Sequence, residues 1–273
     1  MSNAKFAKAA ADHVYKLPLA GTYSISSLYI EFSQRVTKFG KANSWRLKEF
    51  GYGSIVTMLS GSEAVESADK IARGWAYLHK GIPQDKTHIS TVDQCYHRWT
   101  LLTMPMATVA AKRKLHFGEH LPNVGPYAPS SGKLISFGDI KALTNYFEED
   151  AHHLAALCIE PVQGWAGTIV PPTEYLKVAQ ELCRKHNVLL ICDEIQTGYG
   201  PNSKDLSYQH EATLEPDMVI MGNAATGVLI SLSYYLISVF MGKKDIMDLV
   251  YKNEIHSIFG ASPIIVKTYI IIS

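Results

Sequence analysis

Asp193 and Gln196 stand in the segment DEIQTGYG (193–200), directly after the apolar run VLLIC (188–192). A carboxylate at the end of a buried strand can accept a hydrogen bond from a protonated ring nitrogen and keep that ring cationic. Gln196, in the turn that follows, can form hydrogen bonds but cannot ionise. This spacing indicates a ligand site above the strand end, with Asp193 as its fixed charge.

A second candidate is the segment SGSEAVESADKIAR (60–73), in which Ser60 and Glu63 have capping-box spacing before a helix. Gly61 allows a tight turn there, and the backbone amides and the Ser62 hydroxyl at such a helix start can bind a phosphate. The alternative interpretation is a well-capped helix with no ligand.

Two further candidates lie beyond other expected strands. Tyr96 and His97, in CYHRWT (95–100), could stack on a planar ligand and hydrogen-bond to it, although either residue taken alone is more often a packing residue. Glu160, in CIEPVQGWAG (158–167), could order the same site. It could equally hold its own loop by accepting hydrogen bonds from backbone amides.

The elements that must position these residues alternate along the chain. Helical periodicity covers residues 64–75, 140–149 and 173–187, while strand-like segments cover 87–94, 154–161, 188–194, 216–222 and 234–242. This alternation predicts an α/β fold of three layers, a mainly parallel sheet with helices on both faces. Ligands in such sheets bind at the carboxyl ends of the strands. No linker or internal repeat divides the chain, which predicts one domain.

The composition limits the classes of partner. The 273 residues are 47% hydrophobic and 19% charged with a net charge of +1, which predicts neither nucleic acid nor an anionic membrane as a partner. No segment has the spacing of a metal site. The uncharged stretch between Asp217 and Lys243 is interpreted as two buried strands around a loop and not as a membrane span. Four cysteines without C-x-x-C spacing indicate buried, reduced thiols in a cytoplasmic protein, with a mitochondrial location left open.

Four segments in this order resemble the class III pyridoxal-phosphate aminotransferases, most closely the ornithine and acetylornithine aminotransferases. They are residues 60–82, YHRWTL (96–101), the block 159–200 and EPDMVIMG (215–222), and the resemblance runs from about residue 54 to 263. It implies the large domain of the fold type I transferases, a pyridoxal 5'-phosphate cofactor, small-molecule amino donors and acceptors, and a dimer.

The resemblance also implies a role for each matching residue. Gly61 and Ser62 would bind the cofactor phosphate, and Tyr96 would stack on its pyridine ring. Asp193 would pair with the ring nitrogen, and Gln196 would contact the ring hydroxyl. Glu160 would be a strand-end acid near the site.

The pattern fails at the position of the catalytic lysine. The family places after PDMVIMG the lysine that forms a Schiff base with the cofactor, and this chain has Asn223 there. An amide is neither nucleophilic nor basic, so ordinary transamination is not expected. Trp99 replaces an arginine of the family, Trp165 replaces the acid of its Q-G-E-A-G loop, and Ile258 replaces a threonine that reaches across the dimer.

The matched region also suggests a division into parts. Residues 1–53 would be a remnant of the N-terminal small domain, 54–263 the large domain, and 264–273 a tail without the C-terminal small domain. The apolar residues Ile270 to Ile272 would form a sticky surface unless another element covers them.

Four hypotheses remain for the function. The chain could keep a cofactor-shaped cleft without transamination, with the cofactor bound non-covalently or lost. It could be an active aminotransferase rescued by another lysine or by a partner subunit. It could be a non-catalytic partner of an intact paralogue, in a heterodimer instead of a homodimer. It could also carry out a lysine-independent reaction with Tyr96, His97 or Glu160 as the acid or base.

Overall fold

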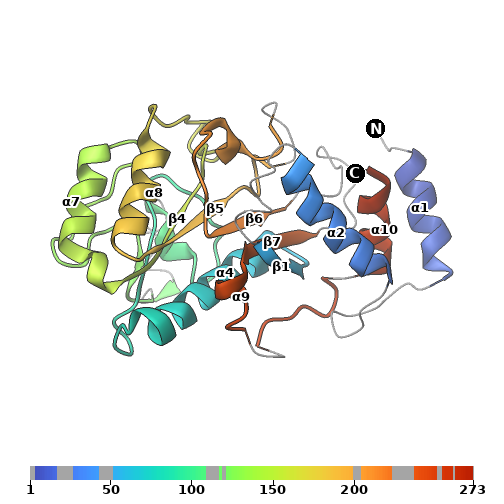
Figure 1. Cartoon of the computed structure of the whole chain (residues 1–273), viewed down its shortest axis with the longest axis horizontal. Coiled ribbons are helices and arrows are strands. Elements are labelled where there is room, and N and C mark those ends of the chain that lie inside the picture. Colours follow the sequence, from blue (N-terminus) through green and yellow to red (C-terminus); the bar gives the residue numbers. More distant parts are fainter. Residues whose placement is uncertain are drawn as a thin grey trace. The chain divides into compact units, whose positions relative to one another are not determined.

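The computed structural model describes residues 4–16, 27–42, 52–108, 117–118, 121–198, 204–222, 237–250, 254–260 and 262–272 (Figure 1). The chain divides into two compact units. The first comprises Met1–Ala64, Ile195–Leu206 and Ile220–Ser273, and the second comprises Val65–Glu194 and Ser207–Val219.

The second unit is built on four parallel strands. They are β2 (His88–Ser90), β3 (Val124–Gly125), β4 (Leu154–Ile159) and β5 (Leu189–Asp193), in the order β3-β2-β4-β5. Every residue of these strands is buried, because helices and loops cover a parallel sheet on both faces.

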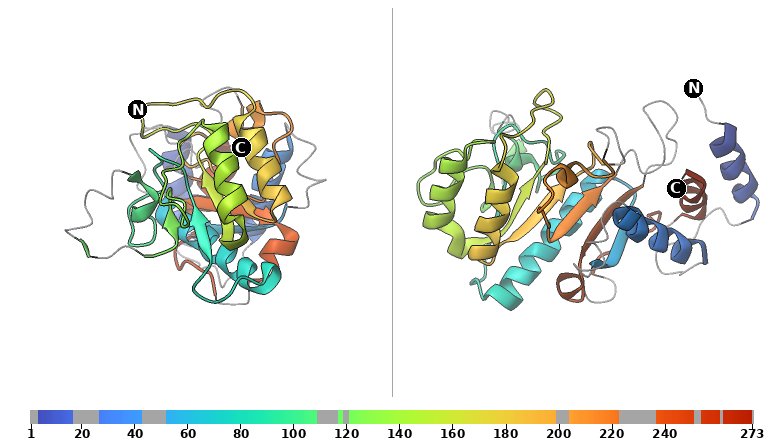
Figure 2. Two further views of the ribbon diagram at one scale, coloured as in Figure 1. Left: turned by 90° about the vertical axis from the view of Figure 1, so that its left-hand side faces the viewer. Right: turned by 45° about the horizontal axis from the view of Figure 1, so that its top comes forward.

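The helices of the second unit flank these strands. They are most of α4 (Gly61–Trp75), the π-helical turn η1 (Ala76–Lys80), α7 (Ile140–Asp150) and α8 (Tyr175–Lys185), with short 3₁₀ turns η2 (Met104–Met106), η3 (Ala151–His153) and η4 (Ser207–His210). Figure 2 shows α7 and α8 on one side of β4 and β5, with α4 on the other side.

Local chemistry explains why these helices begin and pack where they do. Asp139 caps α7, since its side chain accepts a hydrogen bond from the Ala142 amide at 2.9 Å. The buried apolar residues of α8 follow helical spacing (Tyr175, Ala179, Leu182 and Cys183), which places one apolar stripe against the sheet.

The first unit contains the antiparallel strands β1 (Tyr52–Met58) and β7 (Ser238–Lys243), with the order β1-β7-β6. The unit boundary falls within β6 (Met218–Met221). Its helices are α1 (Ala4–Val14), α2 (Ser27–Ala42), α9 (Lys244–Met247) and α10 (Pro263–Ile272). The strands of the chain thus form a mixed, mostly parallel sheet, and the predicted α/β class is confirmed.

Ile270, in the apolar C-terminal segment, is covered within the first unit. Helix α10 packs against both α1 and α2. Ile270 is only 6% exposed, and its carbonyl accepts a hydrogen bond from Arg35 at 2.7 Å. Burial by α1 and α2 therefore removes Ile270 from the sticky surface that the sequence suggested.

Other expectations can be compared with the described residues. The expected helices and strands between residues 60 and 222 are confirmed, and so is β7. All four cysteines are free and buried, as predicted. None of the helices in the described ranges has the length and apolar character needed to cross a membrane. The division into residues 1–53, 54–263 and 264–273 stays a prediction.

Candidate functional site

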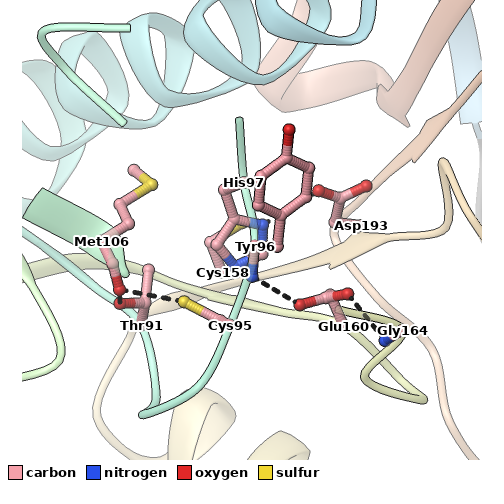
Figure 3. Close-up of polar contacts among 9 residues, drawn as sticks. All are labelled: Thr91, Cys95, Tyr96, His97, Met106, Cys158, Glu160, Gly164 and Asp193. Atoms are coloured by element: carbon pink, nitrogen blue, oxygen red, sulfur yellow. Dashed lines mark hydrogen bonds and ion pairs between the residues drawn. The ribbon is translucent and has the colours of Figure 1, made fainter. Parts of the chain in front are cut away.

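Glu160 joins two loops at the carboxyl ends of the parallel strands (Figure 3). It follows β4 directly and is buried, and its two carboxylate oxygens accept hydrogen bonds from the Tyr96 amide at 2.8 Å and the Gly164 amide at 3.2 Å. Burial raises the pKa of Glu160, against the opposing effects of His97 and these two amides. This geometry matches the loop-holding alternative considered for Glu160, and a catalytic role for it stays a prediction.

Asp193 and His97 form a buried ion pair at the end of β5. The Asp193 carboxylate lies 2.9 Å from Nδ1 of His97, and the side chains are 3% and 0% exposed. The two residues are 96 positions apart in sequence. The parallel sheet brings them together because the loops after β2 and β5 both leave its carboxyl edge.

The surroundings of His97 keep it protonated. Burial by itself lowers the pKa of His97, but the nearby thiols of Cys158 and Cys95 and the hydrogen bond to Asp193 raise it well above its usual value. Burial also raises the pKa of the Cys158 thiol to about 12, so that this thiol is neutral near pH 7. The carboxylate of Asp193 is therefore the charge that stabilises the imidazolium.

The loop that carries Tyr96 and His97 is fixed by a shared acceptor. The Met106 carbonyl accepts hydrogen bonds from the Cys95 thiol at 2.9 Å and from the Thr91 hydroxyl at 3.0 Å (Figure 3). Both donors are buried. Cys95 is thus a structural residue next to the site.

Tyr96 belongs to a cluster of three aromatic rings. Trp165 stacks on Tyr96 with ring centroids 5.1 Å apart and planes 20° apart, and Trp99 meets both rings edge-on at 5.9 and 5.7 Å. The guanidinium of Arg98 lies over the Tyr96 ring at 5.1 Å. Trp165 is 55% exposed. The ring predicted to stack on a cofactor is thus already stacked on Trp165.

The predicted phosphate-binding residues lie at the start of α4, in the first unit. The capping box forms as expected, with the Ser60 amide donating to Glu63 at 2.8 Å and the Glu63 amide donating to the Ser60 hydroxyl at 3.2 Å. Within the described ranges, neither the amides of Gly61 and Ser62 nor the Ser62 hydroxyl take part in these capping bonds. They therefore remain suited to an anion.

The loop that resembles the dimer-crossing loop of the family also lies in the first unit. Its Ser257 hydroxyl donates to Glu63 at 3.4 Å, and Ile258 is exposed. A Cβ at Gly260 would collide with the Thr57 carbonyl, so only glycine fits this close approach.

The structure does not test the roles of two predicted residues. Gln196 is exposed in the first unit, with no hydrogen bond among the described residues. Asn223 lies outside the described residues. Their predicted roles stay predictions.

The sequence analysis missed Asp69, which lies on the buried face of α4. Asp69 is 0% exposed and interacts electrostatically with both His97 and Asp193. The sequence did indicate that Asp69 is buried. Asp69 is four residues after Val65 and three before Ala72, so it falls on the apolar stripe of the helix.

A cavity of about 690 Å³ opens elsewhere in the second unit. Its lining includes Lys70, Arg73, Tyr77 and Asn123, and none of the predicted cofactor residues belongs to it. It is therefore distinct from the cluster around Asp193.

Comparison with known proteins identifies the family of the chain. A family model described as aminotransferase class-III matches residues 18–270. The chain belongs to the class III aminotransferases. This match confirms the family that the sequence motifs implied. Pyridoxal phosphate is the cofactor of this family, as the motifs also implied.

The similar class III aminotransferases are longer chains. The ornithine aminotransferase of Emericella nidulans is 35% identical over 260 residues, which are 95% of this chain and 54% of the relative. That of Saccharomyces cerevisiae is 36% identical over 259 residues, 94% of this chain and 57% of the relative. The chain thus spans about half the length of the curated relatives it matches.

Solved structures support the same family and fold. The crystal structure of the ornithine aminotransferase from Toxoplasma gondii matches with a TM-score of 0.81 at 30% identity, covering 99% of this chain and 58% of the other. The fold is therefore that of the fold type I pyridoxal-phosphate transferases.

Proposed function

We propose that this class III aminotransferase homologue binds pyridoxal or pyridoxamine 5'-phosphate without a covalent bond and does not carry out ordinary transamination. The observation that carries the proposal is the buried pair of Asp193 and His97 at the carboxyl end of β5. An ionised carboxylate at this position can hold a protonated ring nitrogen. A bound cofactor would supply an electron sink, since its protonated ring withdraws electrons.

The other residues that would hold the cofactor follow from the family. Gly61 and Ser62, at the start of α4, would bind the phosphate through their amides and the Ser62 hydroxyl. Tyr96 would stack on the ring, and Gln196 would contact the ring hydroxyl. Each of these residues has the polar or aromatic group that its role requires.

The lack of ordinary transamination follows from the sequence at position 223. The reaction needs an amine that bonds to the cofactor and then carries a proton between two carbons of the substrate. The side chain of Asn223 supplies neither the nucleophile nor the base. His97 and Glu160 do not replace it in this proposal, because their described partners are Asp193 and two backbone amides.

The family also suggests how this protein assembles and where it is located. We expect a cytoplasmic protein that pairs with a second copy or with a paralogue, since dimers are typical of the family. Residues 54–263 would correspond to the large domain of the family. Any substrate would be a small amino compound.

Asp193→Asn tests the proposal directly. We expect this variant to bind pyridoxamine 5'-phosphate about 10- to 150-fold more weakly than the natural protein, because a charge-assisted hydrogen bond contributes about 1.5–3 kcal/mol. Isothermal titration calorimetry would measure the dissociation constants. Pyridoxamine 5'-phosphate is the appropriate probe because it has no aldehyde and cannot react with surface lysines.

Two controls separate binding from folding. Asp85→Asn makes the same chemical change at an exposed position of the second unit and should leave binding unchanged. Pyridoxamine without its phosphate should bind weakly to all three proteins. Equal affinity of the natural protein and a folded Asp193→Asn variant would contradict the proposal.

Trp165→Ala tests whether the aromatic cluster limits cofactor binding. If the cofactor ring takes the place of Trp165 on Tyr96, the variant should bind pyridoxamine 5'-phosphate up to about tenfold more tightly, because a stacked aromatic pair contributes about 0.5–1.5 kcal/mol. The affinity of Trp165→Phe should lie between those of the natural protein and Trp165→Ala. Weaker binding by Trp165→Ala would show instead that Trp165 supports the site.

A further inference from the structure

Asp69 is a buried carboxyl group to which the proposed function gives no role. It lies on α4, its side chain is fully buried, and neither of its carboxylate oxygens has a hydrogen-bond partner within the described ranges. Burying an unpaired polar group is costly, and burying an unpaired charge costs more. Such a residue indicates either a compensating neighbour or a functional reason.

His97 offers the complementary group. Its Nδ1 lies 2.9 Å from Asp193, while its Nε2 is buried without a hydrogen-bond partner in the part of the chain that the structure describes. All three residues belong to the second unit. A buried acid and a buried base, each with unsatisfied atoms, thus lie in the same unit, and the positive charge of His97 stabilises an ionised Asp69.

Burial dominates the ionisation of Asp69. It raises the pKa of Asp69 to about 7, with His97 and Arg73 acting to lower it and Asp193 and Glu66 acting to raise it. Glu66 and Arg73 flank Asp69 on α4 itself, whereas His97 and Asp193 lie on other segments. The neighbouring Cys158 thiol carries no charge near pH 7, since burial raises its pKa to about 12. Asp69 can therefore change its charge near neutral pH.

We infer that Asp69 is a positioning residue for the proposed cofactor site: its carboxylate balances the charge of His97, so that the negative charge of Asp193 acts on the cofactor ring. This inference rests on the proposed function. With Asp69 protonated, the charges of His97 and Asp193 cancel. With Asp69 ionised, the three residues carry one net negative charge, which attracts a cationic ring more strongly.

The inference predicts a pH-dependent difference in cofactor binding. At pH 6 the natural protein and Asp69→Asn should bind pyridoxamine 5'-phosphate with similar affinity, because Asp69 is then mostly protonated. At pH 8 the variant should bind about tenfold more weakly. The ratio of the two dissociation constants cancels the titration of the ligand itself. Asp85→Asn, at an exposed position, should show a ratio near one at both pH values.

A second measurement does not depend on cofactor binding. The imidazole of His97 can be followed by NMR in the protein without cofactor, with His97→Gln used to assign its signal among the 11 histidines. Asp69→Asn should lower the pKa of His97, because a neighbouring negative charge is removed. An unchanged His97 titration would overturn the inference. Failure of every protein to bind the cofactor, with the His97 shift present, would instead contradict the proposed function alone.

Discussion

Asn223→Lys is expected to convert reversible cofactor binding into covalent binding at position 223. The family places its Schiff-base lysine at this position, and the asparagine here cannot react with an aldehyde. If the residues that hold the ring and phosphate are intact, a lysine amine would lie next to the cofactor aldehyde, where proximity strongly favours reaction. Borohydride reduction followed by peptide mass spectrometry would locate the adduct.

Matched variants make this result specific. Asn223→Arg adds a positive charge without a comparable nucleophile and should give no adduct at position 223. Pyridoxamine 5'-phosphate, which has no aldehyde, should give none with any variant. Adducts confined to the same surface lysines as in the natural protein would falsify the idea that the cleft is retained.

Asp69→Asn is expected to stabilise the protein above neutral pH. The pKa of Asp69 is about 7 in the folded protein, against 3.8 as its ordinary value. Folding therefore favours the protonated form of Asp69. The contribution of Asp69 to the free energy of unfolding falls as pH rises from about 4 to 7. With about 1.4 kcal/mol for each pKa unit, the loss is on the order of 4 kcal/mol. Asparagine does not ionise, so the variant does not lose this stability.

The measurement is the difference in the free energy of unfolding between the two proteins. Urea unfolding at pH 4.5, 6 and 8 should give a small difference at the lowest pH and the largest at pH 8. The two proteins must be compared because His97 also makes stability fall as pH rises. Its raised pKa stabilises the folded protein at low pH, and this stabilisation is lost as pH rises through that pKa. A difference independent of pH would contradict a buried, titrating Asp69.

Much of the fold could be predicted from periodicity. Strands β4 and β5 are short apolar runs, and α4 and α8 have clear apolar stripes. Strand β3 was missed because two residues carry no pattern, and β1 because TyrGlySer at its start weakens the strand signal. The helices α1 and α2 were also missed.

The sequence could predict which residues belong to the candidate site, but not which of them contact one another. The sequence singled out His97, Glu160 and Asp193 as separate strand-end residues. The sheet showed that Asp193 pairs with His97 and that Glu160 holds the loop of Tyr96. These partners are far apart in sequence, so no local spacing could indicate them.

The sequence by itself determined the family, the expected cofactor and the substitution at position 223, because these depend on residue types in a fixed order. Only the tertiary structure decided that Trp165 stacks on Tyr96 and that Asp69 is buried near His97. The physical reason is that stacking and desolvation depend on which side chains the fold brings together. The charge state of Asp69 in particular follows from burial, which a sequence does not specify.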